Sequence, residues 1–208
     1  MPDITLFCED SFHENFVRAL LDRFASEYDV SITTRFRSSR GGLPRLHGEL
    51  KDFLRDLSKE THPMPDRIIV VVDANCQGHG GRKKMLDAVL HNYPQFQQSV
   101  DYAIPDPHIE RWMLVDPIAF QTVFQRGCTL PAIKCEKDEY KRLLRNEIRE
   151  SGVDAPLGGQ EFAEDIVKAM NLARVELQES SLGHFLKTLK GLFNTWGTTE
   201  RRITVGED

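Results

Sequence analysis

The sequence predicts an α/β fold in which helices flank a parallel sheet and a helical extension follows at the C-terminal side. Two short runs of apolar and β-branched residues, ITLFCE and RIIVVVDAN, each end in polar residues and lead into a helical pattern. Continuous apolar runs of this kind are typical of parallel strands that are covered on both faces. Strands that alternate with helices are joined by right-handed crossovers, which place them parallel in one sheet.

The first half of the chain alternates strand and helix. The apolar runs predict four strands, at about residues 4–8, 30–36, 67–72 and 99–104. Apolar residues spaced by three and four predict helices from residue 11, at about 46–57 and at about 83–91. Ser11 and Glu14 have the spacing of a capping box. Asp106 is expected to cap a short helix that has Pro107 in its first turn, and the stretch DANCQGHGGR is interpreted as a loop.

The second half of the chain lacks this alternation. A charged helix is predicted at 136–150, and further helices at 160–178 and 181–195. We therefore expect a first domain at residues 1–118 and a helical extension at 119–208 that packs on it. The apolar stripe of the first helix and the later Trp112 are expected to be core rather than a binding platform; the stripe consists of Phe12, Phe16, Leu20 and Phe24.

Composition excludes several classes of protein. The chain has 208 residues, of which 40% are apolar and 28% charged, and these values are ordinary for a globular protein. No run approaches the roughly 20 apolar residues of a membrane span, and the N-terminus has no basic leader pattern. The four cysteines form no CxxC pair, so a reduced, cytoplasmic setting is expected. A zinc site that uses Cys128, Cys135 and a histidine is a weaker alternative.

Acidic residues follow two of the predicted strands. Glu9 ends the first apolar run and Asp73 ends the third. In open α/β sheets, ligands bind beyond the carboxyl ends of the strands, so two acids at two such ends can share one pocket. Oxygen ligands of this kind suit Mg²⁺, which needs only one or two protein carboxylates. Helix capping is the competing explanation for each acid taken alone.

Basic residues gather in three groups, although the net charge of −5 argues against a protein that coats nucleic acid nonspecifically. Two groups lie in loops near predicted strand ends, where binding of a phosphate backbone competes with ordinary solvation; we assign to this role Arg35, Arg37, Arg40, Arg82 and Lys83. The third group is interpreted as a solvated helix face; it consists of Lys134, Lys137, Lys141, Arg142 and Arg145.

Several segments together resemble the Toprim family of topoisomerases, primases and OLD-type nucleases. FCEDSFHENFVRALL matches the first motif of the family, with Glu9 as its glutamate, and VVVDANCQGHGGR matches the later DxD motif at Asp73. This chain has Asn75 where the family has its second aspartate. YAIPDPHIERWMLVD resembles the signature IPxPxIExWLLAD of a bacterial Toprim-like family that is commonly encoded beside ABC-type ATPases, and SSLGHFLKTLKGLF resembles the closing helix of that family.

The resemblance implies a metal-dependent nuclease that acts on DNA or RNA. Glu9, Asp73 and Glu110 would be catalytic, and Glu9, Asp73 and Asn75 would bind Mg²⁺ or Mn²⁺. It also implies an effector subunit, which the composition places in the cytoplasm without a membrane span; the sequence leaves its oligomeric state open, and a homo-oligomer is one alternative. This effector would work beside an ABC-type or OLD-like ATPase in settings that suggest defence against phage.

Two alternatives remain open, and the neutral Asn75 supports the first of them. The first is a non-catalytic binding or regulatory subunit whose site has decayed and which docks on the ATPase or holds nucleic acid. The second is a phosphotransferase or nucleotide-binding protein. Neighbouring residues also have two interpretations. Glu110 is either a site residue or an outward-facing residue that pairs with Arg111 or another base. His13 is expected to be exposed, and His108 to border the pocket without a required role. His79 is expected in a surface turn.

Overall fold

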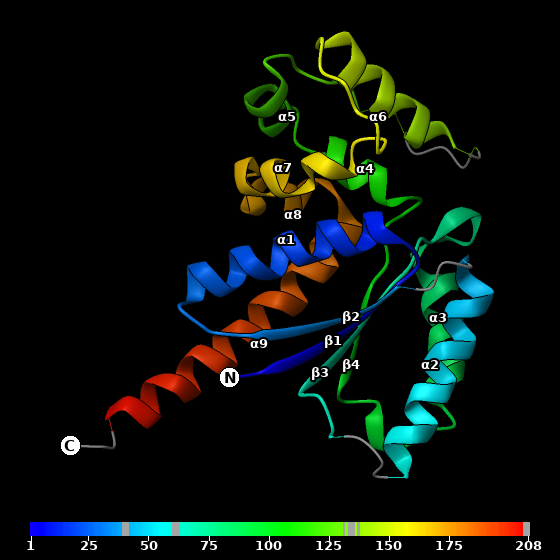
Figure 1. The fold of residues 1–208 in the computed structure, drawn as a ribbon, viewed down its shortest axis with the longest axis vertical. Helices are drawn as coiled ribbons and strands as arrows, with labels where there is room; N and C mark the ends of the chain where they lie inside the picture. Colours follow the sequence, from blue (N-terminus) through cyan, green and yellow to red (C-terminus); the bar gives the residue numbers. More distant parts are fainter. Residues whose placement is uncertain (39–41, 60–62, 131, 133–135, 137, 206–208) are drawn as a thin grey trace.

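A computed structural model describes residues 1–38, 42–59, 63–130, 132, 136 and 138–205. Its centre is a sheet of four parallel strands in the order β2-β1-β3-β4, flanked by helices (Figure 1). The strands are β1 (Asp3–Cys8), β2 (Thr33–Ser38), β3 (Arg67–Val71) and β4 (Val100–Ala103). The predicted α/β class, with its parallel sheet and helical C-terminal part, is confirmed.

Strand register brings the carboxyl ends of the strands to one level. Cys8, the last residue of β1, lies opposite Ser38 of β2 and Val71 of β3. The ladder continues one residue further, because the Glu9 N–H donates to the Val71 carbonyl at 3.1 Å. The side chains that follow β1 and β3 therefore emerge beside each other, as the apolar runs predicted.

One face of the sheet is covered by α1 and α9, and the other helices of the second half pack on these two or on one another (Figure 1). These helices are α1 (Ser11–Tyr28), α4 (Ile109–Leu114), α5 (Pro117–Phe124), α6 (Glu139–Glu150), α7 (Ala163–Ala169), α8 (Leu172–Gln178) and α9 (Ser180–Val205). They share one hydrophobic core, in which the ring of Phe16 lies 5.7 Å from Trp112 and Phe24 lies 5.6 Å from Phe193. The expected boundary at residue 118 falls inside α5, and the helices beyond it complete the core that α1 begins.

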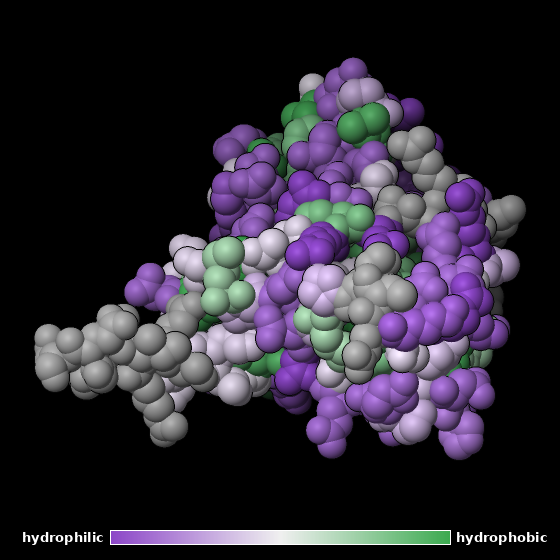
Figure 2. All heavy atoms as spheres, turned by 60° about the horizontal axis from the view of Figure 1, so that its bottom comes forward, coloured by the Kyte–Doolittle hydropathy of each residue, from purple (hydrophilic) through white to green (hydrophobic). Residues whose placement is uncertain are grey.

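The other face is covered by α2 (Gly42–Ser58) and α3 (Gly78–Leu90). These two helices form a second core with Phe7 of β1 and with Ile68 and Val70 of β3. On the molecular face drawn in Figure 2, hydrophilic side chains predominate and hydrophobic ones form small, separate patches. This distribution agrees with two cores that are each closed by their own helices. No helix among the described residues is both long and apolar enough to cross a membrane.

The helix starts differ from those expected. Asp10, not Ser11, caps α1, since its side chain accepts hydrogen bonds from the N–H groups of Phe12 and His13. The glycine-rich stretch is not an open loop, because a 3-10 turn (Asn75–Gln77) leads directly into α3. Asp106 accepts the N–H of His79 at 2.9 Å and so caps α3, not the short helix α4.

Cys8 and Cys128 are buried free thiols. Cys135, the other cysteine of the alternative zinc site, lies outside the described residues. His79 lies half-buried in the first turn of α3 instead of in a free surface turn.

Candidate metal centre

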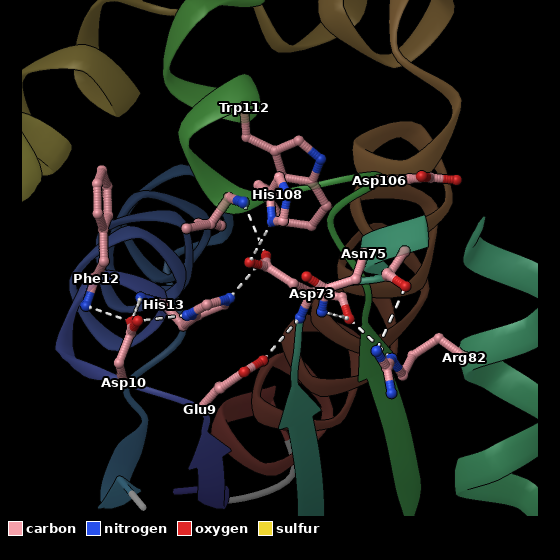
Figure 3. Close-up of polar contacts among 12 residues, drawn as sticks. Glu9, Asp10, Phe12, His13, Asp73, Asn75, Arg82, Asp106, His108 and Trp112 are labelled. Atoms are coloured by element: carbon pink, nitrogen blue, oxygen red, sulfur yellow. Dashed lines mark hydrogen bonds and ion pairs between the residues drawn. The ribbon is translucent and has the colours of Figure 1, made fainter. Parts of the chain in front are cut away.

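Asp73 lies at the centre of the polar cluster at the carboxyl edge of the sheet, two residues beyond β3. Its carboxylate is buried and accepts three hydrogen bonds (Figure 3). Oδ1 accepts from His13 Nε2 at 2.9 Å and from the Ile109 N–H at 2.8 Å. Oδ2 lies 3.0 Å from His108 Nδ1. Donors from α1, from the segment before α4 and from α4 itself therefore converge on one carboxylate.

Glu9 reaches the same place from the end of β1. Its Oε2 accepts the N–H of Asp73 at 3.3 Å, and the side chain stays half-buried. Ligand atoms of Glu9, His13 and Asp73 all lie within 4.8 Å of one another, which is close enough for one ion to contact all three. The structure thus brings together the two acids that the sequence placed at strand ends, and it adds a histidine.

The expectation that His13 is exposed is wrong. Its side chain is buried in the first turn of α1, which lies directly over the strand ends. Nδ1 lies 2.7 Å from Asp10 Oδ1, while Nε2 faces Asp73. This is the arrangement in which a carboxylate orients a metal-binding imidazole through its other nitrogen. Helical spacing gave a signal, because His13 precedes the buried Phe16 and Val17 by three and four residues.

The electrostatics of the cluster follow from burial and from these contacts. Burial alone would raise the pKa of Asp73, but the charge of His13 and the hydrogen bonds from both histidines outweigh it and lower that pKa. Burial would lower the pKa of His13, but Asp73 and Asp10 raise it well above its ordinary value. Burial raises the pKa of Glu9; His13 opposes that rise, and the charge of Asp73 adds to it. In the absence of a cation, protonated His13 therefore bridges two carboxylates.

Glu110 lies in the first turn of α4 and is only 1% exposed, so the outward-facing alternative is wrong. It also does not pair with Arg111, whose Nε donates to Glu179 at 2.8 Å. The Oε2 atom of Glu110 is buried and has no hydrogen-bond partner among the described residues. Burial raises the pKa of Glu110, and the charge of Asp73 raises it further. Glu110 is therefore a buried acid beside the cluster, with one oxygen that no described residue satisfies.

Asn75, the third expected ligand, has a different local role. Its backbone is left-handed, with φ of 52°, and its Nδ2 donates to the Asp73 carbonyl at 3.4 Å. The side chain thus stabilises the turn that carries Asp73. Asn75 adds no charge to the cluster.

The expected basic residues are dispersed. Arg82 is buried, with Nε donating to the Asp73 carbonyl at 2.8 Å, so its assignment to a phosphate surface is wrong (Figure 3). Its place on the buried side of α3, four residues before Leu86, explains this. Lys83 pairs with Asp87 at 2.7 Å and lines a separate cavity beside β4 and α9.

Arg35 and Arg37 lie within edge strand β2, not in the loop after it. Arg35 pairs with Asp3 at 3.1 Å, and the guanidinium of Arg37 lies 4.6 Å from the ring centroid of Phe53. Arg40 lies outside the described residues. The acids that were expected to share a site are therefore gathered, and the cations that were expected to accompany them are not.

Comparisons with known proteins gave no relative: no family model, no curated protein and no solved structure matches this chain.

Proposed function

We propose that this chain is a metal-dependent nuclease that hydrolyses phosphodiester bonds of DNA or RNA. The observation that carries the proposal is the group of Glu9, His13 and Asp73 at the carboxyl edge of the sheet, with ligand atoms within 4.8 Å of one another. Ligands of α/β proteins bind at this edge. The segments that resemble Toprim motifs supply these same acids.

The residues fit a divalent cation. The ligand atoms of two carboxylates and one imidazole are close enough to contact one ion, and the nearby Glu110 has a buried oxygen without a hydrogen-bond partner among the described residues. Asp10 already holds the second nitrogen of His13, as in metal sites with a supporting carboxylate. An imidazole beside carboxylates is a softer donor set than oxygen alone, so we favour Mn²⁺ over Mg²⁺. Binding displaces the His13 proton that now faces Asp73, and affinity therefore rises with pH.

The chemistry divides between the cation and the protein. A bound divalent cation supplies a water of lowered pKa and neutralises charge on the phosphate. Asp73 and His13 fix the position of the site, since both are buried and hydrogen-bonded. Glu9 is the more accessible acid and is the candidate to accept or return a proton. Asn75 leaves the site with one negative charge fewer than a DxD pair would give.

A partner is part of the proposal. The segments that resemble the bacterial Toprim-like family support an effector that works in the cytoplasm beside an ABC-type or OLD-like ATPase, in defence against phage. A nuclease of this kind has to be restrained until it is triggered, so we expect little cleavage by the isolated chain. The helical part beyond residue 118 is the proposed docking surface, because the strand ends already carry the acidic site.

A second candidate function is a non-catalytic binding or regulatory subunit. Both oxygens of Asp73 are already satisfied by protein donors, and His13 compensates two carboxylates. A network that is complete without a cation is what a decayed site would retain. This observation favours the alternative, whereas the unpartnered oxygen of Glu110 favours a live site.

A cleavage assay separates the two functions. The wild type, Glu9→Gln and Asp73→Asn are each reconstituted with the ATPase partner, and cleavage of labelled DNA and RNA is followed with and without Mn²⁺ or Mg²⁺. The proposal predicts metal-dependent cleavage that each variant lowers by at least about 100-fold. Glu164→Gln is the matched control, because Glu164 is exposed and pairs with Lys168 away from the cluster. Equal cleavage by the wild type and both site variants, or none by any of them, would leave the binding subunit as the better account.

A further inference from the structure

Helix α6 carries a row of exposed cations that line a groove. Lys141, Arg142, Arg145 and Arg149 lie on the exposed side of this helix, opposite the segment Val153–Ala155. The groove between them has a volume of about 640 Å³. Three of the cations are spaced by four residues, so they follow one another along the helix at about 6 Å intervals. A regular row of charge suits a linear polyanion.

These four cations are not paired with acids among the described residues. None of them forms an ion pair with a described residue, whereas cations elsewhere, such as Arg18, Arg45 and Lys83, each pair with an acid on the same helix. Asp138 and Asp154 also line the groove, so four positive charges face two negative ones. The sequence pattern favoured a solvated face. Single exposed cations without an ion pair, such as Lys51 and Lys187, also occur elsewhere among the described residues, but here four of them gather along one groove.

The groove adjoins the candidate metal centre. Tyr140, at the start of α6, is buried against α4, with its ring centroid 6.4 Å from that of His108. Its hydroxyl accepts a hydrogen bond from Arg111 at 3.2 Å. Lys141 is the next residue, and its charge acts on Glu110: burial raises the pKa of that acid, and Lys141 partly offsets the rise. Figure 1 shows α6 beyond α4, on the side of the molecule toward which the strands point.

We propose that the α6 groove binds the phosphate backbone of a nucleic-acid strand and leads that strand to the metal centre. The role of the strand as a substrate rests on the proposed function, but its binding does not. The α6 groove takes the place of the basic loop that the sequence suggested, because Arg35 is paired and Arg82 is buried. Phosphate contacts by exposed lysine and arginine are independent of base sequence and sensitive to salt.

Binding is measured by the fluorescence anisotropy of labelled single-stranded DNA, and of RNA of the same sequence, over a salt series in EDTA. The test variant combines Lys141→Gln, Arg142→Gln and Arg149→Gln; Arg145 is left unchanged because its side chain packs over Gly158. We expect at least about tenfold weaker binding at low salt, and a slope of log affinity against log salt that is smaller by about 2, since three phosphate contacts are lost. The DNA and RNA arms show which strand the groove prefers.

The matched control combines Lys51→Gln, Lys59→Gln and Lys187→Gln, three exposed cations that also form no ion pair with a described residue and that lie outside the groove. It changes the net charge equally and should leave the slope nearly unchanged. Urea unfolding checks that both variants fold, and the single substitutions replace the triple one if it does not. Equal binding by the test variant and the wild type, an equal loss in the control, or no binding by the wild type would overturn the proposal.

The outcomes also separate this inference from the proposed function. The binding measurement is made in EDTA and so does not depend on a metal. Binding that depends on the groove, without any metal-dependent cleavage, would contradict the proposed nuclease function and support nucleic-acid binding by the α6 groove. Cleavage that depends on Glu9, combined with nucleic-acid binding that is unchanged when the α6 cations are replaced, would contradict the role of the groove and support the nuclease function.

Discussion

The candidate metal centre and the α6 groove differ in how their charges are compensated. In the candidate centre, the buried His13 lies within hydrogen-bonding distance of the buried Asp73 and the partly exposed Asp10, and their charges compensate. In the groove, exposed cations lie side by side, and none of them forms an ion pair with a described residue. A buried charge must be compensated or the fold loses stability, whereas an exposed charge is solvated and costs little. The centre should therefore matter to both stability and activity, and the groove to binding alone.

Removal of Asp73 should have the largest effect on stability. Asp73→Ala leaves protonated His13 buried with only Asp10 as a partner, and it also leaves the Ile109 N–H without its acceptor. Loss of one member of a buried ion pair costs about 3–5 kcal/mol, so we expect a decrease of that size in the free energy of unfolding. Urea unfolding at neutral pH measures it. A loss below about 1 kcal/mol would mean that the cluster is not compensated as we describe.

Asp116 separates the effect of burial from that of the metal centre. It is fully buried and caps α5 through the N–H groups of Ile118 and Ala119, and it accepts the Asn171 N–H at 2.9 Å. Burial would raise the pKa of Asp116, but these hydrogen bonds and Arg174 lower it. Because the folded pKa lies below the unfolded one, the stabilisation is complete above about pH 4 and is lost as the pH falls through the folded value.

Asp116→Asn should therefore lower the free energy of unfolding by about 1–3 kcal/mol at pH 7, and the difference from the wild type should shrink below about pH 4. Urea unfolding at a series of pH values gives both numbers. Metal-dependent cleavage should be unchanged at temperatures where the variant is folded. A difference that stays constant down to low pH would show that Asp116 is not held in its charged form.

The groove should have the smallest effect on stability. The combined substitution of Lys141, Arg142 and Arg149 removes exposed charges that pair with no described acid, so the free energy of unfolding should change by less than about 0.5 kcal/mol. The same variant is expected to lose nucleic-acid binding. A large loss of stability would instead show that these side chains support the fold, and the contrast between the two regions would fail.

The sequence predicts the positions of the residues that directly follow the strands. Glu9 and Asp73 were placed together correctly because a parallel register aligns the strand ends. The class of fold followed from the same apolar runs. Strand register does not determine where the segments after the last strand lie. The contact of His108 with Asp73 and the packing of α6 near α4 depend on residues that are far apart in the sequence.

For residues on helices, the polar character of a side chain predicts burial less well than its position on the helix does. The polar character of His13 and Arg82 predicts accessible side chains, yet each lies three or four residues from buried apolar neighbours on its own helix. A position on the apolar side of a helix therefore predicts burial better than the polarity of the side chain does. The glycines at 78, 80 and 81 suggested a loop, but Asp106 caps this stretch from a distant segment and allows α3 to begin there. The contact between Asp106 and the His79 N–H cannot be predicted from the local sequence, because the two residues lie 27 positions apart.

Binding of Mn²⁺ is the most direct test of the central claim, which is that the group of Glu9, His13 and Asp73 holds a divalent cation. Electron paramagnetic resonance measures the free aqueous ion as protein is added, for the wild type, Glu9→Gln and the control Glu164→Gln. Glu9→Gln keeps the shape of the side chain and removes its charge. We predict that the wild type and the control bind Mn²⁺ with equal affinity and that Glu9→Gln binds at least about tenfold more weakly. Absence of binding by the wild type, or equal binding by Glu9→Gln, would contradict the claim.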